Sequence, residues 1–269
     1  MEAGLQSLPP GVRPVATDTA LDEVILPPES RQRIDWIVQW VRHSPHELSE
    51  WGLRRYFDGG LRALFRGASG TGKSMAAAGL AREVGLPLLR VDLSAIVSKY
   101  IGETERNLRQ LFDAARDQGA VLVFDEADGL LGKRGAIRDA HDRHANAKVG
   151  TLLRRMEGYE GLAILTTSAK SELAGEAVSR VDVIVEFPMP DEAARRALWE
   201  GLLRTVTIFG AADVDVAGLA NSYELSGAEI LRCVRMASLL AASGDTHLDG
   251  ETLKAFAAER AAMRSVAPE

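Results

Sequence analysis

The chain has 269 residues, 46% of them hydrophobic, and a formal net charge of −6. This length accommodates one or two domains with a buried core, while the acidic balance argues against broad nucleic-acid binding, which usually leaves a basic footprint. The single cysteine, Cys233, excludes a disulfide framework or a cysteine-based metal cluster. We find neither a secretion signal nor the roughly 18 uncharged apolar residues of a membrane span, so we expect a cytoplasmic protein.

The N-terminal region contains two kinds of segment. Residues 1–22 are rich in proline, glycine and small side chains without periodicity, so we expect an extended or flexible arm. Residues 28–56 carry apolar side chains near helical spacing, with three tryptophans interleaved, which predicts helices beside the next domain. We expect these tryptophans to serve packing rather than to form a binding surface.

Short apolar runs then alternate with amphipathic stretches along the middle of the chain. The runs are 61–65, 87–91, 120–124, 162–167 and 183–187. This alternation predicts an α/β domain over residues 23–190, with a parallel five-stranded sheet flanked by helices. Each run would form one strand, and the stretches between them would form the covering helices.

After Pro190 the pattern becomes helical and no further strand pattern remains. Asp191 is the expected N-cap of the first helix, and Ser226 with Glu229 has the spacing of a capping box before another apolar-periodic run. A last helix is expected to begin near Asp249. Residues 191–269 therefore predict a small all-helical domain.

The segment after the first apolar run reads GASGTGKS and fits the pattern G-x-x-x-x-G-K-[ST]. Glycines let the main chain approach phosphates without a Cβ clash, and a helix N-terminus supplies backbone N–H donors. Lys73 would reach the β- and γ-phosphates, and the Ser74 hydroxyl would ligate magnesium. The pattern therefore predicts a P-loop that binds ATP and Mg²⁺. The expected binding residues are Gly67, Ala68, Ser69, Gly70, Thr71, Gly72, Lys73, Ser74 and Met75.

A second motif, VLVFDEAD over residues 121–128, brings two carboxylates to the end of an apolar strand. Open α/β sheets place their chemistry at this end of the strands. We expect Asp125 to hold the magnesium ion, directly or through water, and Glu126 to polarise the attacking water for an in-line displacement. In isolation such a pair would often only cap a loop. Together, the two motifs predict an Mg²⁺-dependent ATPase.

Over residues 24–262 the sequence resembles an AAA+ ATPase of the classical AAA clade, and features beyond the two phosphate motifs carry this resemblance. Within residues 97–115, Tyr100, Ile101 and Gly102 match the aromatic-aliphatic-glycine step of the family's central pore loop. The resemblance implies a ring of six subunits in which this tyrosine grips an extended polypeptide. The alternative is that the tyrosine packs on its own domain.

Two departures from the family's pattern bear on hydrolysis. Ser168 occupies the sensor-1 position, normally an asparagine that orients the attacking water, and serine is shorter. The resemblance therefore implies slower hydrolysis or the use of Thr167 instead. Arg180 matches one of two arginine-finger positions that act on the neighbouring subunit, but Ala177 occupies the other. Because fingers supply roughly 10³ to 10⁵ in rate, a modest ATPase is implied; the alternative for Arg180 is a local salt bridge.

The resemblance extends to segments on either side of the expected site. Gly227 and Ala228 match the start of the family's lid helix, where small residues would let the lid backbone approach the nucleotide. Val24 and Ile25 occupy the place where the family packs a segment against adenine, although a buried strap without ligand contact is equally compatible. These four residues are the candidate contacts outside the phosphate loop.

The charged stretch 136–148 contains His141 and His144 among aspartates. Its spacing matches no strong zinc signature, so we expect a solvated loop or a subunit contact. Together with the length of a single ring and the sequence YIGETE, this stretch resembles AAA+ ATPases encoded with phage-tail-like contractile injection systems. The resemblance implies a protein client or a larger protein assembly as the partner.

The leading hypothesis is a homo-oligomeric ATPase, expected to be a hexamer, that threads or remodels protein past Tyr100. The alternative of a different class is a nucleotide-gated docking module, in which ATP orders the ring for assembly and hydrolysis is slow or incidental. Ser168 and Ala177 keep that alternative open. A third hypothesis is a nucleic-acid remodeller, against which the acidic balance and the aromatic pore step argue.

Overall fold

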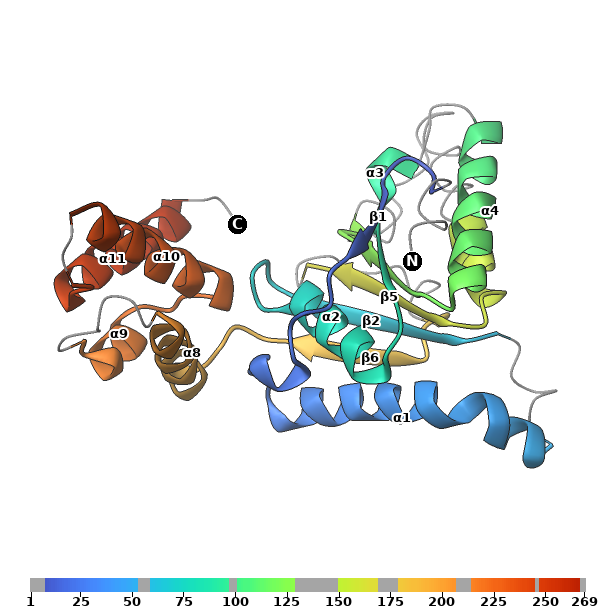
Figure 1. Ribbon diagram of the computed structural model, residues 1–269, viewed down its shortest axis with the longest axis horizontal. Helices are drawn as coiled ribbons and strands as arrows, with labels where there is room; N and C mark the ends of the chain where they lie inside the picture. Colours follow the sequence, from blue (N-terminus) through green and yellow to red (C-terminus); the bar gives the residue numbers. More distant parts are fainter. Residues whose placement is uncertain are drawn as a thin grey trace. The chain divides into compact units, whose positions relative to one another are not determined.

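The computed structural model comprises two compact units of the chain. They are Met1–Gly67 with Lys73–Phe187, and Ala68–Gly72 with Pro188–Glu269. The residues that the structure describes are 8–52, 59–96, 101–128, 150–168, 179–206, 214–244 and 247–266. Figure 1 shows a sheet flanked by helices in the first unit and a group of helices in the second.

The first unit is built on a six-stranded sheet in the order β1-β3-β4-β5-β2-β6. All neighbouring strands run parallel except β1, which pairs with β3 in the antiparallel direction. The expected α/β P-loop architecture is confirmed, but the sheet is mixed and has one strand more than the five predicted. The strands are β1 (Val12–Val15), β2 (Leu61–Gly67), β3 (Leu88–Asp92), β4 (Val121–Asp125), β5 (Leu162–Thr167) and β6 (Val183–Phe187).

The additional strand, β1, comes from the segment for which the sequence predicted an extended or flexible arm without a strand. Residues 12–15 read VRPV, with the two valines half-buried and the residues between them exposed. Pro14 cannot donate a ladder hydrogen bond, and an edge strand tolerates this because one side of it needs no partner. Pro14 argued against a strand in this segment, whereas the alternation of half-buried valines with exposed residues fits a strand at the edge of the sheet.

The helices of the first unit cover both faces of the sheet. Alternate residues of one strand divide between two cores: Leu64 packs into one, while Ala63 and Phe65 pack into the other. Helices α1 and α2 contribute to the core of Phe65, and α3, α4 and the helix at 150–157 contribute to the core of Leu64. The helices are η2 (Leu21–Glu23), α1 (Pro28–Glu50), α2 (Lys73–Val84), α3 (Leu93–Ile96) and α4 (Ile101–Gln118).

Helix α1 protects the exposed edge of the sheet at β6. The Ser30 hydroxyl donates to the Glu186 carbonyl oxygen at 2.7 Å, and the Arg33 guanidinium donates to the Ile184 carbonyl oxygen at 2.5 Å. These side chains occupy backbone acceptors that would otherwise be available to another strand. Among the described residues of the segment for which helices were expected, one continuous helix spans Pro28–Glu50.

The second unit contains four helices among its described residues. They are α8 (Glu192–Thr205), α9 (Val216–Ser222), α10 (Gly227–Gly244) and α11 (Gly250–Val266). The expected caps are confirmed: Asp191 accepts from the Ala194 N–H at 2.8 Å, and Ser226 and Glu229 exchange hydrogen bonds in a capping box. Trp199 is fully buried in the core of this unit. Within the described part of the chain, no helix is both long enough and apolar enough to cross a membrane.

Candidate active site

The phosphate-loop motif lies between β2 and α2, and its two ends belong to the first unit. The Lys73 ammonium group, at the first residue of α2, donates to the Gly67 carbonyl oxygen at 2.5 Å. Burial lowers the pKa of Lys73, although three neighbouring carboxylates oppose that effect. They belong to Asp128, Asp125 and Glu126. A half-buried lysine at a helix N-terminus is well suited to binding phosphate oxygens.

The tip of the loop, Ala68–Gly72, belongs to the second unit, where it contacts the start of α10. Gly70 and Gly72 have φ angles of 81° and 99°, a region that is costly for residues with a Cβ atom. The Ala228 N–H donates to the Gly70 carbonyl oxygen at 3.0 Å. A Cβ atom on Gly70 would lie 2.7 Å from the Ser226 Oγ. Glycine is therefore required at position 70 both by backbone conformation and by packing.

Asp125 ends β4 beside the start of α2. Its Oδ1 accepts from the Ser74 hydroxyl at 3.3 Å and from the Thr166 hydroxyl at 3.0 Å, while Arg90 forms an ion pair with its Oδ2. Mg²⁺ commonly binds one or two protein oxygens and completes its coordination with phosphates and water. The hydroxyl of Ser74 and the carboxylate of Asp125 are thus a donor pair that fits magnesium.

Glu126 directly follows Asp125 and has an exposed side chain. Its φ angle is 53°, and among the described residues it alone combines a side chain with a positive φ. That conformation costs about 1–2 kcal/mol, and such strain is often found at functional sites. The backbone N–H of Glu126 donates to Thr166 Oγ1 at 3.2 Å, and that of Ala127 donates to the Thr166 carbonyl oxygen at 2.9 Å. Thr166 therefore anchors the turn that carries the two acids.

Ser168 lies just beyond the end of β5. Its backbone N–H and its hydroxyl both donate to Asp128 Oδ1, at 2.8 and 3.0 Å. The Thr167 hydroxyl donates to the Ser168 carbonyl oxygen at 3.1 Å, and Thr167 is buried. Of the two candidate sensor residues, Ser168 is the one joined to the acidic motif of β4.

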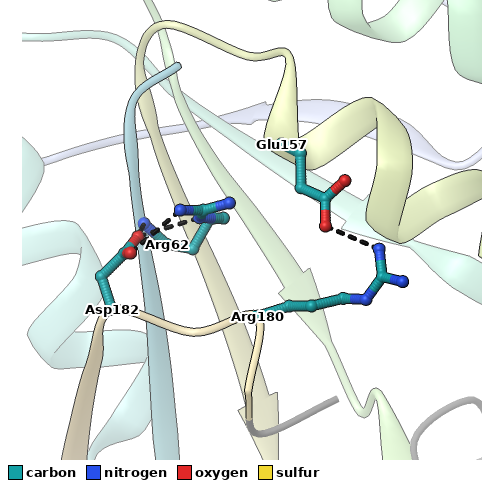
Figure 2. A network of polar contacts seen from close by, with 4 residues as sticks. All are labelled: Arg62, Glu157, Arg180 and Asp182. Carbon is teal, nitrogen blue, oxygen red and sulfur yellow. Dashed lines mark hydrogen bonds and ion pairs between the residues drawn. The ribbon is translucent and has the colours of Figure 1, made fainter. Parts of the chain in front are cut away.

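Arg180 lies outside the phosphate-loop and acidic motifs, in a second cluster of charges (Figure 2). Its guanidinium group forms an ion pair of 2.6 Å with Glu157, and both side chains are partly exposed. Beside it, Asp182 accepts from the backbone N–H and the guanidinium of Arg62, at 2.8 to 2.9 Å. The hydrogen bond to Asp182 raises the pKa of Arg62, although burial lowers it. Arg180 therefore makes the local salt bridge that the sequence offered as one alternative.

Residues 63–189 match the family model for the "ATPase family associated with various cellular activities (AAA)". The chain carries an AAA ATPase domain. The match runs from β2 to the end of β6 and includes the phosphate loop, both acidic residues, Ser168 and Arg180. The predicted P-loop ATPase class is confirmed.

Three relatives support the assignment of the AAA domain. A proteasome-activating nucleotidase of Methanoregula boonei is 32% identical over 59% of this chain. A katanin p60 ATPase-containing protein of Danio rerio is 32% identical over 71% of this chain, and a vesicle-fusing ATPase of Arabidopsis thaliana is 32% identical over 77%. The aligned parts are 38%, 40% and 30% of those three proteins, so the chain spans well under half of each.

Several predicted residues of the AAA domain are only partly described or are not described. Tyr100, Ala177, His141 and His144 lie outside the described residues. Ile101 and Gly102 begin α4, and a Cβ atom on Gly102 would meet open space. The predicted adenine contacts differ in exposure, because Val24 is buried while Ile25 is 37% exposed. Of the remaining predicted residues, Met75 is 40% exposed on α2, and Gly227 starts α10.

Sequence reasoning missed Thr166, Arg90 and Asp128. Of these three, Arg90 alone carries a signal within its own strand, whereas Thr166 is found only through the strand register. Thr166 follows Leu165, which lies opposite Phe124, so the parallel register brings it beside Asp125. Arg90 interrupts an otherwise apolar run, and a charged residue within a buried strand requires a partner.

Proposed function

We propose that this chain binds Mg-ATP and hydrolyses it within an assembly of its own copies, using the energy to remodel a protein client. The observation that carries the proposal is the convergence of the Ser74 hydroxyl and the Asp125 carboxylate, 3.3 Å apart, with Glu126 next in the chain. A hydroxyl after the loop lysine and a carboxylate at a strand end are the protein ligands that phosphoryl transfer needs. The AAA family match to the same residues supports this proposal.

Each side chain then has a distinct role. Lys73 binds the β- and γ-phosphates, and Ser74 and Asp125 hold magnesium, which when bound neutralises charge on the phosphates. Glu126 orients the attacking water and accepts its proton. Its exposed side chain on a strained turn is free to reach a ligand while Thr166 fixes the backbone.

Ser168 and Arg180 complete the proposed chemistry. Asp128 accepts from the Ser168 hydroxyl, so Ser168 orients water through its own lone pairs rather than by donating this proton. Arg180 leaves its ion pair with Glu157 when a neighbouring subunit presents a nucleotide, and then stabilises the transferring phosphoryl group. Because the side chains of Arg180 and Glu157 are 30% and 37% exposed, their ion pair is partly open to water, and breaking it has a small cost.

The proposal also covers the assembly that the subunits form and the protein client on which it acts. Relatives named for activating the proteasome and for fusing vesicles are consistent with a protein client. A hexamer that threads its client past Tyr100 and Ile101 is the form that we favour, with Gly227 and Ala228 approaching the nucleotide. The narrower link to contractile injection systems stays a prediction, because it depends on residues 136–148 and the sequence YIGETE.

The test measures ATP hydrolysis per subunit over a wide range of protein concentrations. For the wild type, specific activity should climb with concentration and reach a plateau, because a finger supplied by a neighbour makes activity depend on assembly. Glu126→Gln and Arg180→Ala should each lower turnover at least about 100-fold. Mixing the two inactive variants should restore part of it, since one supplies the finger and the other supplies the carboxylate.

Two results would contradict this proposal. Full activity in dilute, monomeric protein would remove the role of assembly. No recovery in mixtures of variants that still bind nucleotide and still assemble would contradict a role for Arg180 at the site of a neighbouring subunit.

A second candidate function is a nucleotide-gated docking module. The observation that favours it is the double hydrogen bond from Ser168 to Asp128, which engages the expected sensor within its own chain. In this case ATP binding orders the assembly and hydrolysis is slow. Partner capture that persists in Lys73→Ala would exclude nucleotide gating, whereas capture that requires ATP but not Glu126 would support it.

A further inference from the structure

The two carboxylate oxygens of Asp125 face different partners. Oδ1 accepts from the hydroxyls of Ser74 and Thr166 at 3.3 and 3.0 Å. Oδ2 is buried and, among the described residues, accepts no hydrogen bond, but it forms an ion pair with the Arg90 guanidinium. The charge of Arg90 is therefore the compensation that the structure provides for this buried oxygen. A buried carboxylate oxygen without compensation is costly.

The sheet register explains why Arg90 reaches this oxygen. Strands β3 and β4 are parallel, with Arg90 opposite Val123 and Asp92 opposite Asp125. Side chains two residues apart on a strand share a face, so Arg90 lies on the same face as Asp125, one step before it. Arg90 thus approaches the carboxylate from within the sheet, while Ser74 approaches it from α2.

The residue that faces Arg90 on the neighbouring strand β1 is also positively charged. In β1, Arg13 lies directly opposite Arg90, and like charges that face each other across two strands are unfavourable. A carboxylate offsets the charge of each arginine: Asp125 pairs with Arg90, and Asp92 lies near Arg13. Arg13 therefore offers a matched control, since it carries the same charge next to Arg90 but is not among the described hydrogen-bond and ion-pair partners of Asp125.

We propose that Arg90 is a positioning residue for magnesium binding: by holding Oδ2 of Asp125, it keeps Oδ1 directed at Ser74. The inference rests on the Mg-ATP site proposed above. Without Arg90, the carboxylate can rotate about its Cβ–Cγ bond and lose the alignment that brings Oδ1 to the Ser74 hydroxyl. Loss of a residue that orients a metal ligand typically weakens metal affinity about 10- to 100-fold.

The positive charge of Arg90 also repels a divalent cation, and this effect has the opposite sign. The Arg90 side chain is 40% exposed, whereas that of Asp125 is 11% exposed. Water screens the long-range repulsion from an exposed guanidinium group, but it does not replace a direct contact with a buried oxygen. Orientation therefore outweighs repulsion, and removing Arg90 weakens magnesium binding.

The experiment compares Arg90→Met, which keeps an unbranched apolar stem but removes the charged group, with Arg90→Lys, which keeps a positive charge on a smaller group. Arg13→Met serves as the control for charge alone. Binding of a fluorescent ATP analogue is measured by anisotropy, first in EDTA and then across a magnesium titration. Circular dichroism shows that each variant is folded, and binding in EDTA shows that its phosphate loop is intact.

We expect Arg90→Met to change the magnesium dependence of nucleotide binding but not nucleotide binding in EDTA. In EDTA, Arg90→Met should bind the analogue within about twofold of the wild type, because the phosphate loop is unchanged. The magnesium concentration at half-saturation should rise about tenfold, with Arg90→Lys in between and Arg13→Met like the wild type. A residue with only a structural role would weaken both readouts together.

Other outcomes overturn the inference in distinguishable ways. If magnesium enhances binding to the wild type and Arg90→Met responds like it or at a lower concentration, Arg90 does not position Asp125, while the magnesium site stands. Equal losses in EDTA and in magnesium would also overturn the positioning role. If magnesium does not affect nucleotide binding to the wild type, the proposed magnesium site itself fails, and the role of Arg90 fails with it.

Discussion

Charged side chains are paired differently at the β2–β6 edge and at the carboxyl end of β4. At the β2–β6 edge, Arg62 engages both oxygens of Asp182, and Arg66 engages both oxygens of Glu186 further along the same strands. Each of these arginines forms two hydrogen bonds with the carboxylate of the neighbouring segment, and these contacts join β2 to the edge strand (Figure 2 shows the first pair). The charges there are matched within the sheet.

At the end of β4 the charged side chains are not paired one to one. Asp125 has partners from three elements, and Glu126 extends into solvent from a strained turn. Lys73 is held near three carboxylates while burial disfavours its charge. We interpret the arginine–carboxylate pairs of the β2–β6 edge as structural, and the three carboxylates near Lys73 are the basis on which we propose a site for a ligand that brings a cation and phosphates.

The largest effect is expected from Glu126→Gln. Removing the carboxylate should lower the ATP hydrolysis rate about 10²- to 10⁴-fold, because general-base assistance is lost, while nucleotide affinity changes little. Steady-state phosphate release and fluorescent nucleotide binding measure the two quantities. Glu160→Gln, also exposed but on the loop before β5, is the control. A similar loss in that variant would mean that charge alone, rather than position, controls hydrolysis.

Gly70→Ala should lower nucleotide affinity at least about tenfold. Alanine at this position has to adopt a left-handed backbone conformation, at a cost of about 1–2 kcal/mol. Its Cβ atom would lie 2.7 Å from Ser226 Oγ. Gly85→Ala is the matched control, because Gly85 has a φ angle of 71° but nothing within 4 Å of the added atom. If both variants lose stability equally and both bind nucleotide normally, the contact between the loop and α10 has no role in binding.

Arg62→Met should lower the free energy of unfolding by about 1 kcal/mol without changing hydrolysis per folded subunit. The Arg62–Asp182 pair is only partly exposed and involves two side-chain hydrogen bonds, so its contribution lies at the upper end for surface pairs. Arg196→Met removes an exposed pair within α8 and should cost about 0.3–0.5 kcal/mol. Urea unfolding compares them; a large loss of activity in Arg62→Met would contradict a purely structural role for this edge.

The effect with the narrowest range of conditions is expected from Tyr159→Phe and appears at high pH. Burial raises the pKa of Tyr159 to about 12, and its hydroxyl donates to the Ala120 carbonyl oxygen. The folded state therefore keeps the proton through a range in which the unfolded state, with a pKa near 10, loses it. The unfolding free energy of the wild type should fall between pH 10 and 12, and this component should be missing in Tyr159→Phe. Urea unfolding at pH 8 and pH 11 measures the difference.

The elements of the fold were easier to predict from the sequence than the contacts around the candidate site. The phosphate loop and the two acids follow from local rules: a glycine-rich turn before a helix, and carboxylates after a buried strand. Asp191, Ser226 and Glu229 were predicted correctly because capping depends on residues three apart. These signals are contained in short segments of the chain.

The interactions that sequence reasoning missed depend on residues brought together by the sheet. Thr166 and Arg90 reach Asp125 from neighbouring strands, and each is far from it in the sequence. The partner of Arg180, Glu157, ends a helix that precedes β5. Pairings of this kind depend on strand order and register, which residue patterns within one strand do not specify.

The short strand β1 has a practical consequence for work on this protein. Residues 12–15 pair with Val91, Arg90, Leu89 and Leu88 and so cover the outer side of β3. Removing them as a dispensable tail would leave a mostly apolar strand with free hydrogen-bonding groups at the margin of the sheet. Such an edge is a template for pairing between molecules, so truncated material would tend to aggregate in the test tube even though every catalytic residue was still present.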